Sequence, residues 1–257
     1  RGPNGAPRPI NARDADDFER LHERRQRPFV VVSTTAARPQ IAGRRVFIYP
    51  EIDVLKGALP DDLDAVVYGS TTGAFGQHEG SPWIDEDTPS RDLGARGRRR
   101  YDYERALATF VKPLKVVRIA GIYGPRRTIW AAMKRPNFLL FEGGPPTSRI
   151  HVDDLATLLM AMGAPKAPSL AIACDEAPTP TLQVAQFTCA LMRAPAPEAL
   201  TLDAAKAQLS ASALEMRMGG RRCRSKIRPG LIGELKYPTY KTGIPAALLA
   251  EGILKEV

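Results

Sequence analysis

Several residue types that build cross-linked or metal-bearing sites are scarce in this sequence of 257 residues. The three cysteines lie far apart and form no C-x-x-C pair, which argues against a disulfide framework and favours a reducing compartment. The three histidines are equally dispersed, so we predict no metal site. No run of about 18 apolar residues occurs, so we predict no membrane-spanning helix. These cysteines and histidines are Cys174, Cys189, Cys223, His22, His78 and His151.

Basic residues, by contrast, are abundant. The chain has 37 Lys and Arg against 28 Asp and Glu, a formal net charge of +9, and 27 of the 37 are Arg. Such an excess favours an anionic partner, although background composition alone is an equally open explanation. The hydrophobic fraction of 44% is enough to bury a core, so the composition is that of a globular protein. The chain begins at Arg1 without Met, which indicates a fragment or the removal of an Arg-rich organellar leader.

Apolar, β-branched runs alternate with helical patterns along the chain. The expected strands are 29–33, 45–49, 65–69, 115–120 and 170–173. The expected helices are 11–26, 96–111, 150–163 (starting after His151), 181–193, 203–218 and 246–254, and 74–95 is expected to be a long loop. The alternation predicts an α/β fold with a parallel sheet flanked by helices and a small C-terminal helical cap.

Five short motifs follow one another in the C-terminal three quarters of the sequence. They are 70–76 (STTGAFG), 82–89 (PWIDEDTP), 117–125 (VRIAGIYGP), 148–156 (SRIHVDDLA) and 235–243 (LKYPTYKTG). In this order they resemble motifs of the extended short-chain dehydrogenase/reductase superfamily, in its atypical NAD-dependent epimerase/dehydratase-like branch. The resemblance implies a truncated Rossmann-like core at 1–160 and a substrate-type cap at 161–257, packed as one unit.

Catalytic members of that superfamily need a Gly-rich turn after the first strand, where backbone and a helix N-terminus approach the pyrophosphate. This sequence has no G-x-G-x-x-G, and the nearest candidate is 2–5 (GPNG). If that segment is the remnant, 11–26 is the first crossover helix and 29–35 is the second strand of the fold, and we favour this register slightly. In the other register, 29–33 is the fourth strand. Both registers leave at least one strand–helix unit missing.

Catalytic members also carry a Tyr-x-x-x-Lys pair on a helix, where the Lys lowers the pKa of the Tyr. In the expected helix 96–111, only Glu104 matches the family pattern Y-G-x-S-K-x-x-x-E. Arg96 and Arg100 then stand at the Tyr and Lys positions, and Arg stays protonated because its pKa is above about 12. Phe75 replaces a further Tyr of the branch. We therefore predict no catalytic residue and a degenerate member of the branch. The resemblance leaves an alternative open for the helix, because the branch also tends to have R-G-R-R-R here, so that the loss of the pair belongs to the branch.

The carboxyl ends of strands are where open α/β sheets bind ligands. The resemblance implies a residual cofactor pocket at this edge, lined by Ser70, Thr71, Thr72, Arg100, Gly121, Ile122 and Tyr123. The alternative is that these hydroxyls and glycines only form turns. We expect no cofactor, or NAD(P) if the pocket is retained. Residues 151–154 (HVDD) are expected to cap a helix.

Two clusters of basic residues are expected near the mouth of that pocket. They are Arg96, Arg98, Arg99 and Arg100, and Arg221, Arg222, Arg224, Lys226 and Arg228. Such clusters bind phosphate, an RNA backbone or acidic protein, or they form a solvated surface.

Three functions follow, in order of preference. The first is a non-catalytic structural or accessory subunit of a larger complex, with other protein subunits as partners, in the mitochondrial matrix or another organelle. The second is an NAD(P)-dependent epimerase, dehydratase or reductase with an atypical active site. The third is an RNA-contacting ribosomal accessory protein that uses the arginines at 96, 98, 99, 100, 221, 222 and 224. Fold alone does not decide between them.

Overall fold

The structure is a computed structural model. It describes residues 29–33, 40–41, 44–45, 47–48, 52, 59, 65–80, 82–135 and 138–255. The expected helix at 11–26 and the candidate Gly-rich turn at 2–5 lie outside these residues.

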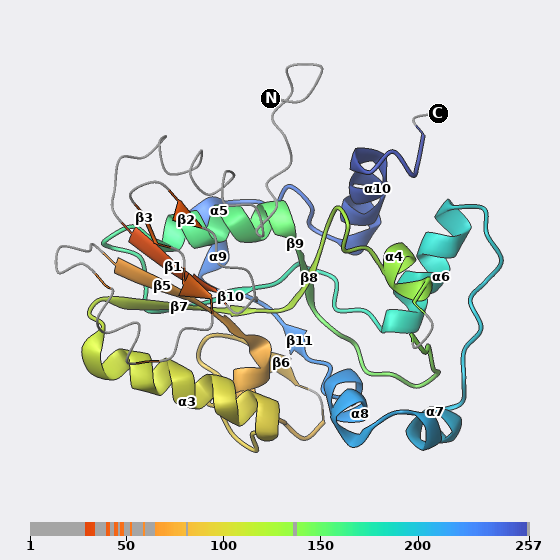
Figure 1. The fold of residues 1–257 in the computed structure, drawn as a ribbon, viewed down its shortest axis with the longest axis horizontal. Helices are drawn as coiled ribbons and strands as arrows, with labels where there is room; N and C mark the ends of the chain where they lie inside the picture. The colour runs from red at the N-terminus through yellow and green to blue at the C-terminus, as the bar shows by residue number, and fades with distance from the viewer. Residues whose placement is uncertain are drawn as a thin grey trace.

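A five-stranded parallel sheet forms the centre of the molecule, in the strand order β10-β7-β5-β1-β4 (Figure 1). The strands are β1 (Phe29–Ser33), β4 (Phe47–Ile48), β5 (Ala65–Thr71), β7 (Leu114–Ile119) and β10 (Leu170–Ala173). The predicted parallel α/β sheet is therefore confirmed. The strand expected at 45–49 is instead divided between β3 (Arg44–Arg45), which pairs with β2 (Gln40–Ile41), and the short β4.

The position of β1 bears on the two registers for the strand at 29–33. β1 pairs directly with β5, from Phe29 opposite Ala65 to Val32 opposite Tyr68. In the usual order 3-2-1-4-5-6 of a dinucleotide-binding sheet, the fourth strand is the neighbour of the fifth. β5 carries the motif that resembles the end of the fifth strand, so this pairing suits β1 as the fourth strand. On its other side β1 pairs with β4, the next parallel strand along the chain, as the third strand lies beside the second in the same order. Both registers therefore stay open, and β1 as the second strand stays a prediction. An apolar, β-branched run suits either interior position, so the strand's sequence does not distinguish them.

Helices cover both faces of the sheet (Figure 1). α3 (Ala95–Phe110) packs on one face, and α5 (Val152–Met162) packs on the other. Alternate side chains of β5 pack into the hydrophobic cores on the two faces of the sheet, because successive strand residues point to opposite faces. The buried core under α3 contains Val66, Tyr68, Leu107, Val111 and Val116, and the core under α5 includes Val67, Val117, Leu155, Leu158 and Met162.

Short strand pairs extend the fold beyond the central sheet. β8 (Gly121–Tyr123) runs parallel to β9 (Arg149–His151), and β6 (Trp83–Ile84) runs parallel to β11 (Arg222–Cys223). The stretch expected to be a loop, 74–95, contains β6 and the second half of a 3₁₀ turn, η1 (Thr72–Phe75). The first motif therefore passes from β5 directly into η1.

Six further helices follow, and they include the predicted helical cap. They are α4 (Ile129–Met133), α6 (Thr181–Leu191), α7 (Leu202–Gln208), α8 (Ala211–Met218), α9 (Arg228–Ile232) and α10 (Tyr240–Ala250). Figure 1 shows α4, α6 and α10 gathered beside the sheet. Among the described residues, no helix has both the length and the apolar character needed to cross a membrane.

Two of the expected helices have different bounds in the structure. The helix expected at 203–218 is divided into α7 and α8, because the side chain of Ser210 accepts a hydrogen bond from the backbone N–H of Ala213 and starts a new helix. α10 begins six residues before the expected start at 246. Thr239 caps its first turn in a capping box, and Pro245 lies inside the helix.

Candidate functional site

The hydroxyl groups at the end of β5 are engaged by the protein itself. Ser70 is buried, and its Oγ donates a hydrogen bond to Oε1 of Glu104 on α3. Thr71 accepts a hydrogen bond from the backbone N–H of Gly73 (3.1 Å) and so caps η1. The hydrogen bond of Thr71 is local and forms a turn, as in the alternative given for these hydroxyls. Ser70 instead bonds to a residue of a different element, the helix α3.

Glu104 joins α3 to the sheet through a buried ion pair. Arg118 on β7 donates to both oxygens of Glu104, with Nη2 to Oε2 at 2.8 Å and Nε to Oε1 at 3.2 Å. The guanidinium also stacks on the ring of Phe75, 4.3 Å from its centroid. Ser70 and Arg118 are partners in the β5–β7 register, so the three polar side chains meet beneath α3. A buried charge pair of this kind needs such complete hydrogen bonding to be tolerated.

The two arginines at the Tyr and Lys positions differ in exposure. Arg96 is exposed, and Arg100 is half-buried one turn before Glu104. Burial lowers the pKa of Arg100 and its neighbour Tyr103 opposes this shift. A guanidinium cannot exchange protons with a substrate near neutral pH, so this helix supplies no general acid or base at these positions.

Tyr123 in β8 is a packing residue. Its side chain is buried, its hydroxyl donates to the backbone oxygen of Thr239 (3.3 Å), and its ring meets His151 edge-on at 5.3 Å. α10 approaches so closely that a Cβ at Gly243 would lie 2.3 Å from the Tyr123 hydroxyl. Position 243 therefore requires glycine, and the tyrosine holds β8 against the cap.

The structure brings the predicted pocket residues of the two strands to the same edge of the sheet, because β5 and β7 are neighbours. Their side chains differ widely in exposure. Gly121 is exposed, Thr71, Thr72, Arg100 and Ile122 are half-buried, and Ser70 and Tyr123 are buried.

These residues do not supply the groups that an NAD(P)-dependent relative would need at this edge. The hydroxyl of Ser70 is held by a carboxylate of the fold, and the helix carries arginines where the Tyr-Lys pair would stand. The sequence also lacks the Gly-rich turn that receives a pyrophosphate. We therefore derive no hydride-transfer or proton-transfer step for this site.

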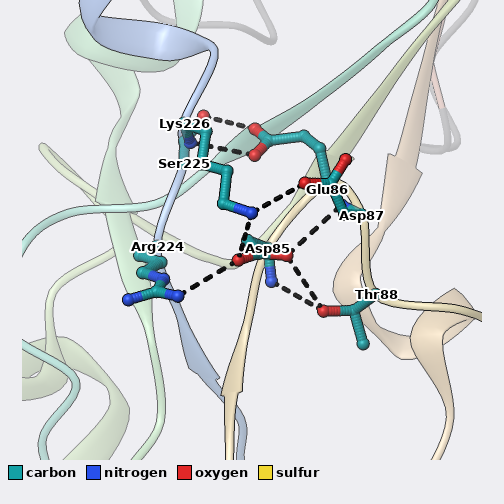
Figure 2. A network of polar contacts seen from close by, with 7 residues as sticks. All are labelled: Asp85, Glu86, Asp87, Thr88, Arg224, Ser225 and Lys226. Atoms are coloured by element: carbon teal, nitrogen blue, oxygen red, sulfur yellow. Dashed lines mark hydrogen bonds and ion pairs between the residues drawn. The ribbon is translucent and has the colours of Figure 1, made fainter.

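The acidic motif at 82–89 binds the basic segment that follows β11 (Figure 2). Asp85 receives Nη2 of Arg224 at 3.3 Å and Nζ of Lys226 at 2.9 Å, and Lys226 also contacts Asp87 at 2.7 Å. Burial acts to raise the pKa of Asp85, but the hydrogen bonds from Lys226 and Arg224 outweigh it and lower the pKa below its usual value. The carboxylate form of Asp85 is thus stabilised in the fold.

Glu86 bonds the basic segment after β11 (Figure 2) and also a strand of the central sheet. Its carboxylate accepts the backbone N–H of Ile172 (3.0 Å), the backbone N–H of Lys226 (2.9 Å) and the hydroxyl of Ser225. Ile172 lies on β10, an edge strand of the sheet. Glu86 therefore covers an N–H group that an edge strand would otherwise leave open to another chain.

The remaining members of the second basic cluster also have partners within the chain. Nη2 of the buried Arg228 lies 3.2 Å from Oε1 of Glu176. Arg221 donates through Nε to the backbone oxygen of Gly76 (2.8 Å). Arg222 stacks 4.6 Å from the ring centroid of Trp83. All five residues of this cluster thus contribute contacts that hold the segment against the acidic motif and its surroundings.

The first cluster has a different environment. Arg96, Arg98 and Arg99 are exposed on the first two turns of α3. In the part of the chain that the structure describes, none of their guanidinium groups makes an ion pair or hydrogen bond. The helix begins after Gly94 with no side-chain cap, and its first turn contains no acidic residue.

His151 caps α5 as predicted for residues 151–154. Its Nδ1 accepts a hydrogen bond from the backbone N–H of Asp153 at 3.2 Å. Burial lowers the pKa of His151 to about 4, with the positive charge of Lys236 acting in the same direction. The imidazole is therefore neutral near pH 7, and its 3.9 Å approach to Asp153 is not an ion pair.

Asp175 is a buried carboxyl at the end of β10 that sequence reasoning did not identify. Burial raises its pKa to about 7, against the opposing effects of the backbone N–H of Ala177 and of Arg149. One carboxyl oxygen accepts that N–H at 3.3 Å, and the other has no hydrogen-bond partner among the described residues. The guanidinium of Arg149 is directed elsewhere, to the backbone oxygens of Thr147 and Thr179 at 2.7 Å each. No group of three or more potential ligands for a metal ion occurs in the described segments.

Comparisons with known proteins agree with the fold. A functionally unknown conserved protein from Silicibacter pomeroyi is 26% identical, with a TM-score of 0.70 over 86% of this chain and 98% of that chain. The human epimerase family protein SDR39U1, solved with NADPH, is 15% identical, with a TM-score of 0.60 over 79% of this chain and 71% of its own. UDP-glucuronic acid 4-epimerase from Bacillus cereus, solved with UDP-glucuronic acid and NAD, is 14% identical, with a TM-score of 0.61 over 95% and 96%.

At 14 and 15% identity, the likeness to the human protein and to the B. cereus epimerase shows the fold alone. The sequence matches no protein-family model and no curated protein. The chain is thus similar to NAD-dependent epimerase/dehydratase-type structures and has their Rossmann-like arrangement of parallel strands and flanking helices.

Proposed function

We propose that this protein is a non-catalytic accessory subunit of a larger assembly, built on an epimerase-type short-chain dehydrogenase/reductase fold. The observation that carries the proposal is the buried cluster of Ser70, Glu104 and Arg118. It occupies the place where strand end and helix meet, with the serine hydroxyl bonded to a carboxylate of the fold. Helix α3, which would present the Tyr-Lys pair, presents arginines instead.

Two further features support the proposal. The acidic motif 82–89, which resembles a motif of the family, is bonded to Arg224 and Lys226 and, through Glu86, to the backbone of β10. Residues of a motif that resembles the family thus link elements of the fold by hydrogen bonds and ion pairs. The basic net charge of +9 supplies a means of binding other subunits, for which an organelle is the proposed setting.

The alternative is an NAD(P)-dependent enzyme. It is supported by neighbours that were solved with NADPH or NAD. An RNA-binding role would have to use chiefly the arginines of α3, because those of the second cluster already have partners within the chain.

Isothermal titration calorimetry of the full chain with NADH and with NADPH separates the two leading functions. We expect no saturable heat for either nucleotide up to millimolar concentration. Saturable binding with a Kd in the range of about 1 µM to 1 mM, the usual range of enzyme KM values, would overturn the proposal. Mutating Glu104 is unsuitable as a control because it disturbs the fold, so the control is the human neighbour with NADPH under the same conditions.

A further inference from the structure

We propose that the solvent face of α3 is the docking surface for an acidic segment of a partner protein. We call it the α3 arginine face and define it by Arg96, Arg98, Arg99 and Arg105. The inference rests on the proposed function only in assigning the protein a partner.

The charge of this face is predominantly positive. Eight residues of α3 are exposed, and they include four arginines against a single aspartate, a net charge of +3. Arg98, Asp102, Arg105 and Thr109 follow one another at four- and three-residue spacing, so they share the outward side of the helix. The other exposed residues, Ala95 and Ala108, are small. A partner element can therefore approach the helix closely between long cationic side chains.

These charges are uncompensated within the described molecule. None of the four guanidiniums makes an ion pair or a hydrogen bond in the residues that the structure covers. Three of them lie at the start of the helix, where the macrodipole already places partial positive charge and where acidic residues are favoured. Among the residues that the structure describes, the arrangement is electrostatically unfavourable, and carboxylates that lie across it would relieve it.

The chemistry of the face favours a protein partner over RNA. Asp102 lies among the arginines and would repel a phosphate backbone, whereas it can face a basic residue of a mixed protein surface. None of the eight exposed residues of α3 is aromatic, so the face offers no ring on which a base could stack. Arginine is also the charged residue that protein interfaces favour, because its planar fork pairs with two carboxylate oxygens at once.

The test uses fluorescence anisotropy with the full chain and two labelled probes at low ionic strength. One probe is a peptide of repeated Glu-Ala pairs, and the other is a polyuridine oligonucleotide of equal charge. The variant Arg98→Glu/Arg105→Glu reverses two charges of the α3 arginine face. The matched control, Lys166→Glu/Lys241→Glu, reverses two exposed lysines elsewhere and gives the same net charge.

We expect the wild-type chain to bind the peptide saturably, the face variant to weaken that binding by about tenfold or more, and the control to change it by about twofold at most. The thermal midpoint of the face variant should stay close to that of the wild type, because Arg98→Glu lies near the helix start, where an acidic residue is favourable, and Arg105 is an exposed position at which substitution changes stability little. Lost binding is then not unfolding. Equal losses in the two variants, or no binding by the wild type, would overturn the proposal. Tighter binding of the oligonucleotide, lost in the face variant, would overturn it in favour of RNA. Each of these results leaves the nucleotide titration unaffected.

Discussion

Two clusters of basic residues have similar composition and opposite environments. The segment 221–228 lies against the acidic motif, and each of its basic side chains has a partner in the chain. Asp102 is the one exposed acid on the helix of the α3 arginine face, because Glu104 is buried against Arg118, and the guanidiniums of the face are exposed. One cluster therefore contributes to holding the fold together, and the other is available to another molecule.

The difference shows that a positive charge count says little until its counter-charges are located. The acidic motif supplies three carboxylates, and Asp85, Glu86 and Asp87 all contact the basic segment (Figure 2). Arg118 also has its counter-charge within the chain, but its pair with Glu104 is buried. Four tests follow from these contrasts, and the first concerns that buried pair.

The largest effect is expected where an arginine is both paired and buried. Replacing Glu104 by Gln keeps the shape but leaves the guanidinium of Arg118 without a counter-charge, which should lower the free energy of unfolding by about 3–5 kcal/mol. Urea unfolding followed by circular dichroism measures it. Asp102→Asn, an exposed acid on the same helix, should change stability by about 0.5 kcal/mol or less. A loss below about 1 kcal/mol in Glu104→Gln would contradict the structural role of the pair.

Asp175 is a buried acid to which, among the described residues, no cation is bonded. Its pKa of about 7 in the fold lies above the usual 3.8, so the folded state holds the proton more tightly than the unfolded state. The stabilisation is therefore complete below pH 3.8 and is lost as the pH rises through 7, by roughly 4 kcal/mol.

The variant Asp175→Asn lacks this titration. We expect its stability relative to wild type to improve between pH 4 and pH 8, as measured by urea unfolding at both values. A constant difference between the two proteins would show that Asp175 titrates normally.

An intermediate effect is expected for the tie between the acidic motif and β10. Glu86→Gln removes the charge that accepts the N–H groups of Ile172 and Lys226, and it should cost about 1.5–3 kcal/mol. Asp87→Asn affects only the exposed contact with Lys226, so a cost of about 0.5 kcal/mol or less is expected. Chemical unfolding compares the two, and equal costs would mean that Glu86 does not anchor the motif.

Reversing the charge of one arginine in each cluster is expected to change stability least, with opposite signs in the two clusters. Arg98→Glu places a negative charge near the start of α3 and should raise stability by about 0.3–1 kcal/mol. Arg224→Glu places a negative charge beside Asp85 and should lower stability by up to about 1 kcal/mol, because the side chain of Arg224 is largely exposed and Lys226 also pairs with Asp85. Thermal melting of both variants at low salt gives the signs, and a shift in the same direction would remove the distinction between the clusters.

Much of the fold is predictable from local patterns. The strands β5, β7 and β10 and the helices α3 and α5 follow from apolar runs and apolar periodicity. The break between α7 and α8 is not predictable in this way, because it depends on one hydroxyl capping a backbone N–H at Ser210 while the apolar pattern continues. The place of β1 in the sheet also depends on long-range pairing, which the β-branched composition of the strand does not encode.

The candidate site was predictable in position but not in its chemistry. The sequence motifs place Ser70 and Gly121 at the same edge of the sheet, and the structure agrees. That Ser70 is bonded to Glu104, 34 positions away, depends on how α3 crosses β5. The basic cluster was visible as charge, but Arg224 and Asp85 are 139 positions apart, so only the fold reveals their pairing.

Arginine footprinting with phenylglyoxal, read by mass spectrometry on the native full chain, tests this division of the arginines most directly. The reagent requires an accessible guanidinium, so buried arginines react only through transient opening. We expect Arg98 and Arg105 to react at least about tenfold faster than Arg118 and Arg228. The result that would contradict the account is equal reactivity, with Arg228 modified as fast as Arg98 or with the α3 arginine face as protected as Arg118.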